Sequence, residues 1–164
     1  MKRTLLPLVL ATVAAPALAL DLTEWGTEGD WVILIDPNHD NNCLAQVAYS
    51  DGSLLRVGFR EKGKEGVLAV VNPAWSQFEK DKKYVLNYSV DGGAGIDAES
   101  KGADVGEMKG IEVPFKDPAV LYALVKGNSL TLTQDGTKLV EMSLVSSAAA
   151  LDKAAICELE QHPG

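Results

Sequence analysis

The stretch from Cys43 to Asn72 constrains the fold more than any other part of the chain. It holds three apolar-rich segments, separated first by Asp51-Gly52 and then by a charged turn flanked by glycines. An Asp-Gly pair is typical of the type I′ turn of a two-residue β-hairpin, so Cys43–Ser50 is predicted to pair with Ser53–Arg60. The whole stretch is therefore predicted to be three consecutive antiparallel strands.

The same turn predicts which side chains share a face. With a two-residue loop, one face holds Leu44, Ala48, Leu55, Val57 and Phe59. Arg56 and Arg60 then project from the opposite face, because side chains alternate along a strand.

Most of the remaining chain also predicts strands. Apolar alternation or turn signals place strands at Trp31–Ile35, Tyr84–Val90, Ile96–Ser100, Ile111–Phe115, Ser129–Gln134 and Lys138–Leu144. The acidic segment Asp21–Asp30, with two glycines, is expected to be a surface entry segment. One helix is predicted to begin at Pro118, with Asp117 as its N-cap, and to be stopped by Gly127. A second helix is predicted to run from Ser146 or Ser147, one of which caps it, through Cys157. The predicted fold is mainly β: an antiparallel barrel-like or sandwich sheet of about eight strands with two short covering helices.

The N-terminus has the features of a secretory signal peptide. Lys2 and Arg3 precede an apolar run that starts at Leu5, and Ala17-Leu18-Ala19 fits a cleavage site. The alternative is a membrane anchor, but the apolar run is shorter than the ~20 residues that a transmembrane helix needs. Residues 1–19 are thus expected to be removed, leaving residues 20–164 as a single β-domain, periplasmic or secreted, without a membrane span.

The charge balance limits the partners. The net charge of −8 becomes −10 without Lys2 and Arg3. Such a surface repels nucleic acid and anionic lipid and attracts basic proteins or cations, although plain solubility explains the same composition.

The chain has two cysteines, Cys43 and Cys157. In an oxidising compartment two cysteines can form one disulfide, and this bond would close a loop across most of the domain. The alternative is a redox or catalytic thiol, but the chain has no C-x-x-C motif, and no basic residue neighbours either cysteine.

The loop after Trp31–Ile35 is the most polar segment of the chain. Asp36, Asn38 and Asp40 alternate as the first ligands of a Ca²⁺ loop do, but a glycine and a glutamate that such loops use later are missing. The alternative is an Asx turn, with His39 as a solvated loop residue. No other metal site and no cofactor is predicted.

Trp75 and Phe78 follow the central strands in an irregular segment. They are either a packing anchor on the core or an aromatic platform for a ligand. Together with His39 they form the candidate interaction surface.

Several segments resemble one family. These segments are Trp31-Val32, Cys43, the strands around Asp51-Gly52, Asn72-Pro73-Ala74-Trp75, Tyr84 with Asp91-Gly92, and the closing run from Ser143 to Cys157. In this order they resemble small exported bacterial proteins akin to the invasion-associated locus B family, although family members often carry additional cysteines. The resemblance implies a periplasmic or secreted β-domain with a disulfide and no established catalytic residues.

The residues argue against most enzyme classes. His39 and His162 are the two histidines, no G-x-S-x-G elbow is present, and a zinc site lacks ligands. The expected function is a non-catalytic binding or interaction module with a protein partner in the envelope or outside the cell. The alternatives are an inhibitor of a basic, lysozyme-type cell-wall hydrolase, a carboxylate-based cell-envelope hydrolase, and a structural envelope protein.

Overall fold

The computed structural model describes residues 22–163. The predicted signal peptide, residues 1–19, lies outside this range. The strands are β1 (Thr23–Glu28), β2 (Trp31–Asp36), β3 (Asn42–Ala48), β4 (Leu54–Arg60), β5 (Glu65–Asn72), β6 (Lys83–Val90), β7 (Ile96–Val105), β8 (Met108–Phe115), β9 (Ser129–Gln134) and β10 (Thr137–Ser143). A short 3-10 helix, η1 (Pro37–His39), follows β2, and the α-helices are α1 (Pro118–Val125) and α2 (Ser147–Gln161).

All ten strands form one antiparallel sheet in the order β1-β2-β3-β4-β5-β8-β7-β6-β9-β10. The first five strands follow the chain. The chain then crosses to β6 and returns through β7, so that β8 pairs with β5, while the β9–β10 hairpin extends the sheet from β6. The mainly β prediction is confirmed. The prediction of about eight strands in a barrel-like or sandwich sheet is corrected to ten strands in one open sheet.

The strand absent from the prediction is β1. Its composition suggested an irregular entry segment, but it pairs with β2, with a register shift between Glu24 and Gly26. An edge strand has one partner and buries little, so its sequence lacks apolar alternation. Charged side chains and a bulge are the usual features of such an edge.

The loop between β3 and β4 differs from the predicted type I′ turn. The Gly52 N–H donates to the Tyr49 carbonyl at 2.9 Å, and the Tyr49 N–H donates to the Ser53 carbonyl at 2.9 Å. Of the central pair only Gly52 has positive φ, at 84°. The Asp51 carboxylate instead accepts from the Ser53 N–H at 2.9 Å, which holds a three-residue loop with glycine in the left-handed position.

This extra loop residue corrects the predicted face. Ala48 pairs with Leu54 rather than with Leu55, and Leu44 pairs with Gly58. Leu44 and Ala48 therefore lie on the face opposite Leu55, because a one-residue slip moves every side chain of a strand to the other face.

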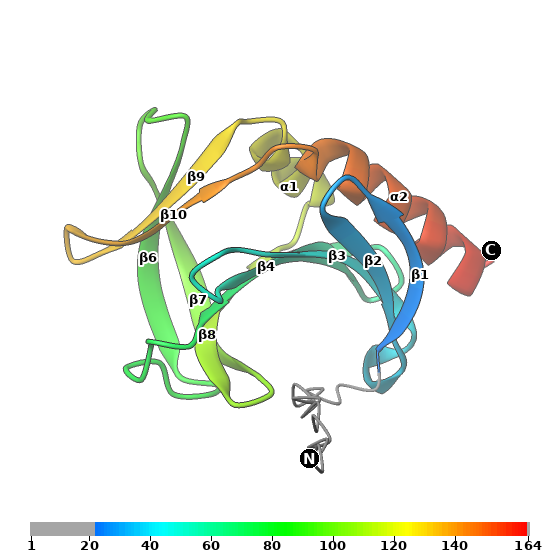
Figure 1. Ribbon diagram of the computed structural model, residues 1–164, viewed down its shortest axis with the longest axis horizontal. Coiled ribbons are helices and arrows are strands. Elements are labelled where there is room, and N and C mark those ends of the chain that lie inside the picture. The colour runs from blue at the N-terminus through cyan, green and yellow to red at the C-terminus, as the bar shows by residue number, and fades with distance from the viewer. Residues whose placement is uncertain (1–21, 164) are drawn as a thin grey trace, which may run out of the picture.

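The hydrophobic core lies between the sheet and the two helices. Figure 1 shows both helices on one side of the sheet. Helix α2 contacts β1 to β4, and α1 contacts β5 and β8. The largest fully buried side chains are Trp31, Phe78, Ile33, Leu55, Leu68, Leu86, Ile111, Leu121, Leu130, Leu132, Leu144 and Leu151. The start of α1 is as predicted: the Asp117 carboxylate accepts from the Ala119 N–H at 2.9 Å, and Pro118 occupies the first turn.

The connection from β5 to β6 lies against β7. The Asp81 N–H donates to the Gly102 carbonyl, and the Gly102 N–H donates to the Lys82 carbonyl. A Cβ atom at Gly102 would overlap the Glu79 carbonyl, so only glycine permits this close approach. The contact places Lys80 and Asp81 beside the face of the sheet opposite the helices.

Candidate functional site

The sheet face opposite the helices, here called the open face, carries a cavity. A row of cross-strand neighbours runs over five strands, through Gln46, Arg56, Ala69, Glu112 and Lys101. The small Ala69 side chain at the centre of this row leaves space between its longer neighbours. Figure 1 shows the strands bending around this face, on which the cavity encloses about 410 Å³.

We call this cavity the trough. Its charged lining includes Asp36, Arg56, Arg60, Lys101, Asp104 and Glu112. Its apolar lining includes Leu44, Val67, Ala69, Ala103 and Val105. The lining thus mixes charged and apolar side chains, and a concavity of this size with convergent polar groups can hold a small molecule.

Both arginines of the predicted mature chain line the trough. They lie on β4, four residues apart on the same face, as the alternation predicted. Arg60 binds Glu112 through both terminal nitrogens and both carboxylate oxygens. The Arg60 and Glu112 side chains are 34% and 17% exposed, so this bidentate pair is partly shielded from water.

Arg56 is in a different situation. Its Nε donates to the Gln46 Oε1 atom at 2.7 Å, and within residues 22–163 its guanidinium forms no ion pair. Burial lowers the pKa of Arg56, and the negative charge of Asp36 partly opposes that shift. A guanidinium remains charged at neutral pH, so the trough contains a half-buried cation whose terminal nitrogens are available to an anion.

Most acidic groups of the trough already have partners. The Asp104 carboxylate accepts from Lys109 Nζ at 3.1 Å, and Glu112 is held by Arg60. The Asp36 carboxylate contacts His39 Nδ1 at 2.8 Å. Asp81 completes the acidic lining.

The predicted polar loop forms an Asx turn at one end of the trough. The Asn38 N–H donates to Asp36 Oδ1 at 3.0 Å, which caps η1, and Asp40 adopts the left-handed region with φ of 60°. The His39 side chain is 63% exposed. Within residues 22–163, no three His, Cys, Asp or Glu side chains lie close enough together to hold a metal ion, and Ca²⁺ binding by Asp36, Asn38 and Asp40 stays a prediction.

The aromatic segment after β5 packs on the core. Phe78 is 1% exposed and contacts the Trp75 and Tyr84 rings edge-on, at centroid distances of 5.2 and 5.1 Å. Trp75 is partly buried against the same cluster. Phe78 therefore serves as a packing anchor. Of the three residues of the predicted interaction surface, Trp75 and His39 are the ones with exposed side-chain surface.

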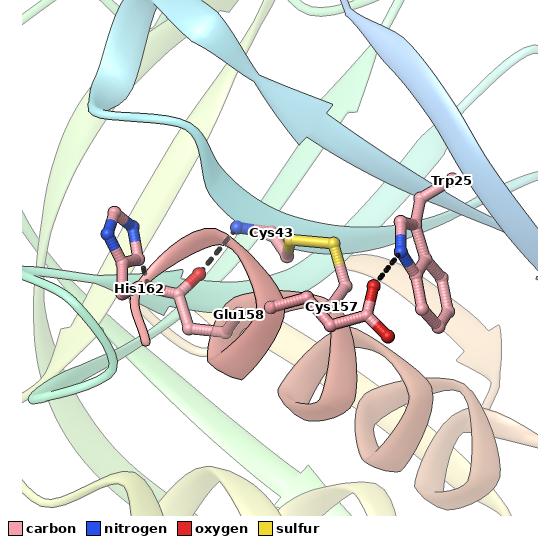
Figure 2. The surroundings of a disulfide bond; sticks show 6 residues. Trp25, Cys43, Cys157, Glu158 and His162 are labelled. Carbon is pink, nitrogen blue, oxygen red and sulfur yellow. Dashed lines mark hydrogen bonds and ion pairs between the residues drawn. A yellow bond between two sulfur atoms is a disulfide. The ribbon is translucent and has the colours of Figure 1, made fainter. Parts of the chain in front are cut away.

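The predicted disulfide is present. Cys43 on β3 and Cys157 on α2 are bonded across 114 residues, and both are 0% exposed (Figure 2). Because neither sulfur is accessible, the bond has the character of a structural crosslink between the helix and the sheet rather than of a redox site.

A buried carboxylate lies beside the disulfide. Glu158 is 4% exposed, and its Oε2 accepts from the Cys43 N–H at 2.7 Å (Figure 2). His162 Nε2 lies 3.4 Å from the other carboxylate oxygen. Burial raises the pKa of Glu158, while the Cys43 N–H and His162 oppose that shift.

The raised pKa of Glu158 predicts a pH-dependent stability. A carboxyl group with a higher pKa in the folded than in the unfolded state binds its proton more tightly when folded. Its contribution to stability is therefore complete below about pH 4, the unfolded value, and is lost as the pH rises through the folded pKa. Glu158→Gln is expected to remove this loss, because an amide oxygen still accepts from the Cys43 N–H and carries no buried charge. The difference in the free energy of unfolding between the variant and the parent should therefore grow in favour of the variant as the pH rises from 4 to 8. Urea unfolding at each pH measures this difference.

Glu160→Gln is the matched control, since Glu160 is exposed on the same helix and its carboxylate accepts from Trp25 Nε1. Parallel pH profiles for Glu158→Gln and Glu160→Gln would contradict the assignment, and ¹³C NMR of the Glu158 carboxyl group measures its pKa directly.

The sequence did not identify the trough or Glu158. The signal for Arg56 and Arg60 was visible, because they are charged residues on a strand in the middle of a sheet. Their partners could not be foreseen, because β8 comes next to β5 only through the crossover. Glu158 follows Cys157 on the packed side of α2, and no local pattern predicts its burial.

Comparisons with known proteins do not add a relationship. No protein-family model, no curated protein and no solved structure matches the chain. Across residues 22–163, no helix is both long enough and apolar enough to span a membrane.

Proposed function

We propose that this protein is an exported, non-catalytic binding protein that takes up its ligand in the trough. The observation that carries the proposal is a 410 Å³ cavity with mixed charged and apolar lining, which holds the half-buried Arg56, a cation without an ion-pair partner among residues 22–163. Three of the four trough carboxylates are engaged, with Arg60, Lys109 and His39, and we take this as support for binding over catalysis. Export and the resemblance to the invasion-associated locus B family are part of the proposal, supported by the signal-peptide pattern and compatible with the buried disulfide.

The test adds a panel of ligands to ¹⁵N-labelled protein expressed from the full-length sequence and detects binding by ¹⁵N–¹H NMR. The panel holds small carboxylates, amines and neutral sugars, and lysozyme as a basic macromolecule. Binding in the trough is expected to move the amide signals of Leu44, Arg56, Ala69 and Glu112 together, because these residues lie on four adjacent strands.

The outcomes separate the alternatives. A small molecule of any charge that shifts these amides supports the proposal. No small-molecule response in the trough would overturn it. Shifts caused by lysozyme alone, on acidic surfaces away from the trough, would replace it with the inhibitor function.

A further inference from the structure

We infer that the ligand of the trough is a small monoanionic carboxylate with an apolar body, and that Arg56 binds its carboxylate group. This inference rests on the proposed function and specifies the ligand class of the same site.

The first step concerns the cation. Arg56 and Arg60 both extend from the open face of β4, Arg56 towards Gln46 on β3 and Arg60 towards Glu112 on β8. Glu112 can satisfy one guanidinium in bidentate geometry, and it binds Arg60. Arg56 retains only the neutral Gln46 oxygen as a partner within the described residues. A planar guanidinium with unoccupied terminal nitrogens matches a carboxylate, which accepts two parallel hydrogen bonds from it.

The second step concerns the charge of the ligand. The trough contains four carboxylates, those of Asp36, Asp81, Asp104 and Glu112, and four cationic side chains, those of Arg56, Arg60, Lys80 and Lys101, while the predicted mature chain carries a net charge of −10. The charges of the lining nearly balance, so the net charge of the chain supplies the repulsion of anions, and this repulsion grows with the charge of the ligand. A single negative charge is therefore accepted at Arg56 more readily than the double charge of a phosphate group.

The third step concerns the rest of the ligand. Ala69 is the direct neighbour of Arg56 on β5, and Val67 lies two residues away on the same face. Leu44, Ala103 and Val105 add further apolar lining. Next to Arg56 the trough thus offers apolar side chains among its charged ones, and these give a hydrocarbon or aromatic body a surface to pack against.

The experiment compares octanoate, 1-octanol and inorganic phosphate on the parent protein, by calorimetry and by the same NMR signals. Octanoate is expected to bind in the trough at least about tenfold more tightly than 1-octanol, because the alcohol lacks the charge-assisted hydrogen bonds. Inorganic phosphate is expected to bind more weakly than octanoate.

Variants assign the effect to Arg56. Arg56→Gln is expected to weaken octanoate binding about tenfold or more and to leave 1-octanol binding unchanged. Arg56→Lys should restore part of the affinity, since lysine supplies the charge without the planar fork. The matched control is Lys126→Gln, because Lys126 is an exposed residue at the end of α1, on the opposite side of the sheet; it should bind octanoate as the parent does.

Three outcomes would overturn the inference: equal affinity for octanoate and 1-octanol, tighter binding of phosphate than of octanoate, or unchanged octanoate binding by Arg56→Gln. The first two comparisons use the parent alone and decide the question even if the variant does not fold. If a neutral sugar or an amine shifts the trough amides while octanoate does not, the carboxylate class fails and the proposed function stands. If no panel member does, both fail.

Discussion

Removal of the Cys43–Cys157 bond is expected to lower the free energy of unfolding by ~4 kcal/mol. The bond closes a loop of 114 residues. On the chain-entropy model a loop of about 100 residues corresponds to ~4.7 kcal/mol, and measured effects are often smaller. For a domain of this size such a loss lowers the melting temperature by roughly 10 °C. The measurement is urea unfolding of the parent with and without reductant, alongside Cys43→Ala, Cys157→Ala and the double variant.

The variants provide the internal control. Each single variant should lose nearly the full amount, and the double variant should be scarcely worse than either, because both changes remove one bond. The protein should still fold, since Ala150, Leu151 and Ala154 continue to bury α2 against the sheet. An unchanged midpoint for reduced protein in which both thiols are titrated would show that the bond does not support the fold.

The elements that the sequence predicted correctly are those set by local interactions. In the β9–β10 hairpin Asp135 and Gly136 both have positive φ, at 49° and 77°, which is the type I′ geometry typical of Asp-Gly. The helix after Asp117-Pro118 and the alternation of Leu86 and Tyr88 on β6 depend equally on neighbouring residues. Interactions between residues close in the sequence were therefore sufficient to predict this hairpin, α1 and β6.

The β3–β4 loop shows where the same signal fails. Asp51-Gly52 is again an Asp-Gly pair, but the Asp51 carboxylate binds the Ser53 N–H and hydroxyl, and Asp51 keeps a negative φ. The hydrogen bonds of the Asp51 carboxylate thus accompany a three-residue loop in place of a two-residue loop, and this register places Leu44 on the open face. The dipeptide alone does not reveal which turn forms.

The candidate site was the least predictable part, because it depends on strand order. Arg60 and Glu112 are 52 residues apart in the chain, and they meet because β8 lies beside β5. The sequence placed Arg56 and Arg60 on one face but could not show that one of them would be paired and the other unpaired. That difference between two neighbouring arginines is the basis of the proposed ligand class.

Trp31→Ala is expected to lower the free energy of unfolding by ~3–5 kcal/mol, because it removes a large side chain from the core. Trp31 is 2% exposed on β2, and its Nε1 donates to the Val145 carbonyl at 2.9 Å. It therefore fills the core and also joins β2 to the segment that leads into α2. Truncation to alanine leaves a large cavity and removes this hydrogen bond. Urea unfolding followed by far-ultraviolet circular dichroism measures the loss, because this signal does not depend on tryptophan fluorescence.

Two variants separate the contributions of volume and hydrogen bonding. Trp31→Phe keeps most of the buried ring and loses the N–H donor, so its loss should be clearly smaller than that of Trp31→Ala. Trp75→Ala is the matched control, since Trp75 is only partly buried and contacts Phe78 edge-on. If Trp31→Ala and Trp75→Ala unfolded at the same urea concentration, Trp31 would not be the core anchor that its burial indicates. A loss for Trp31→Phe as large as that for Trp31→Ala would instead assign the effect to the hydrogen bond that holds the entry to α2.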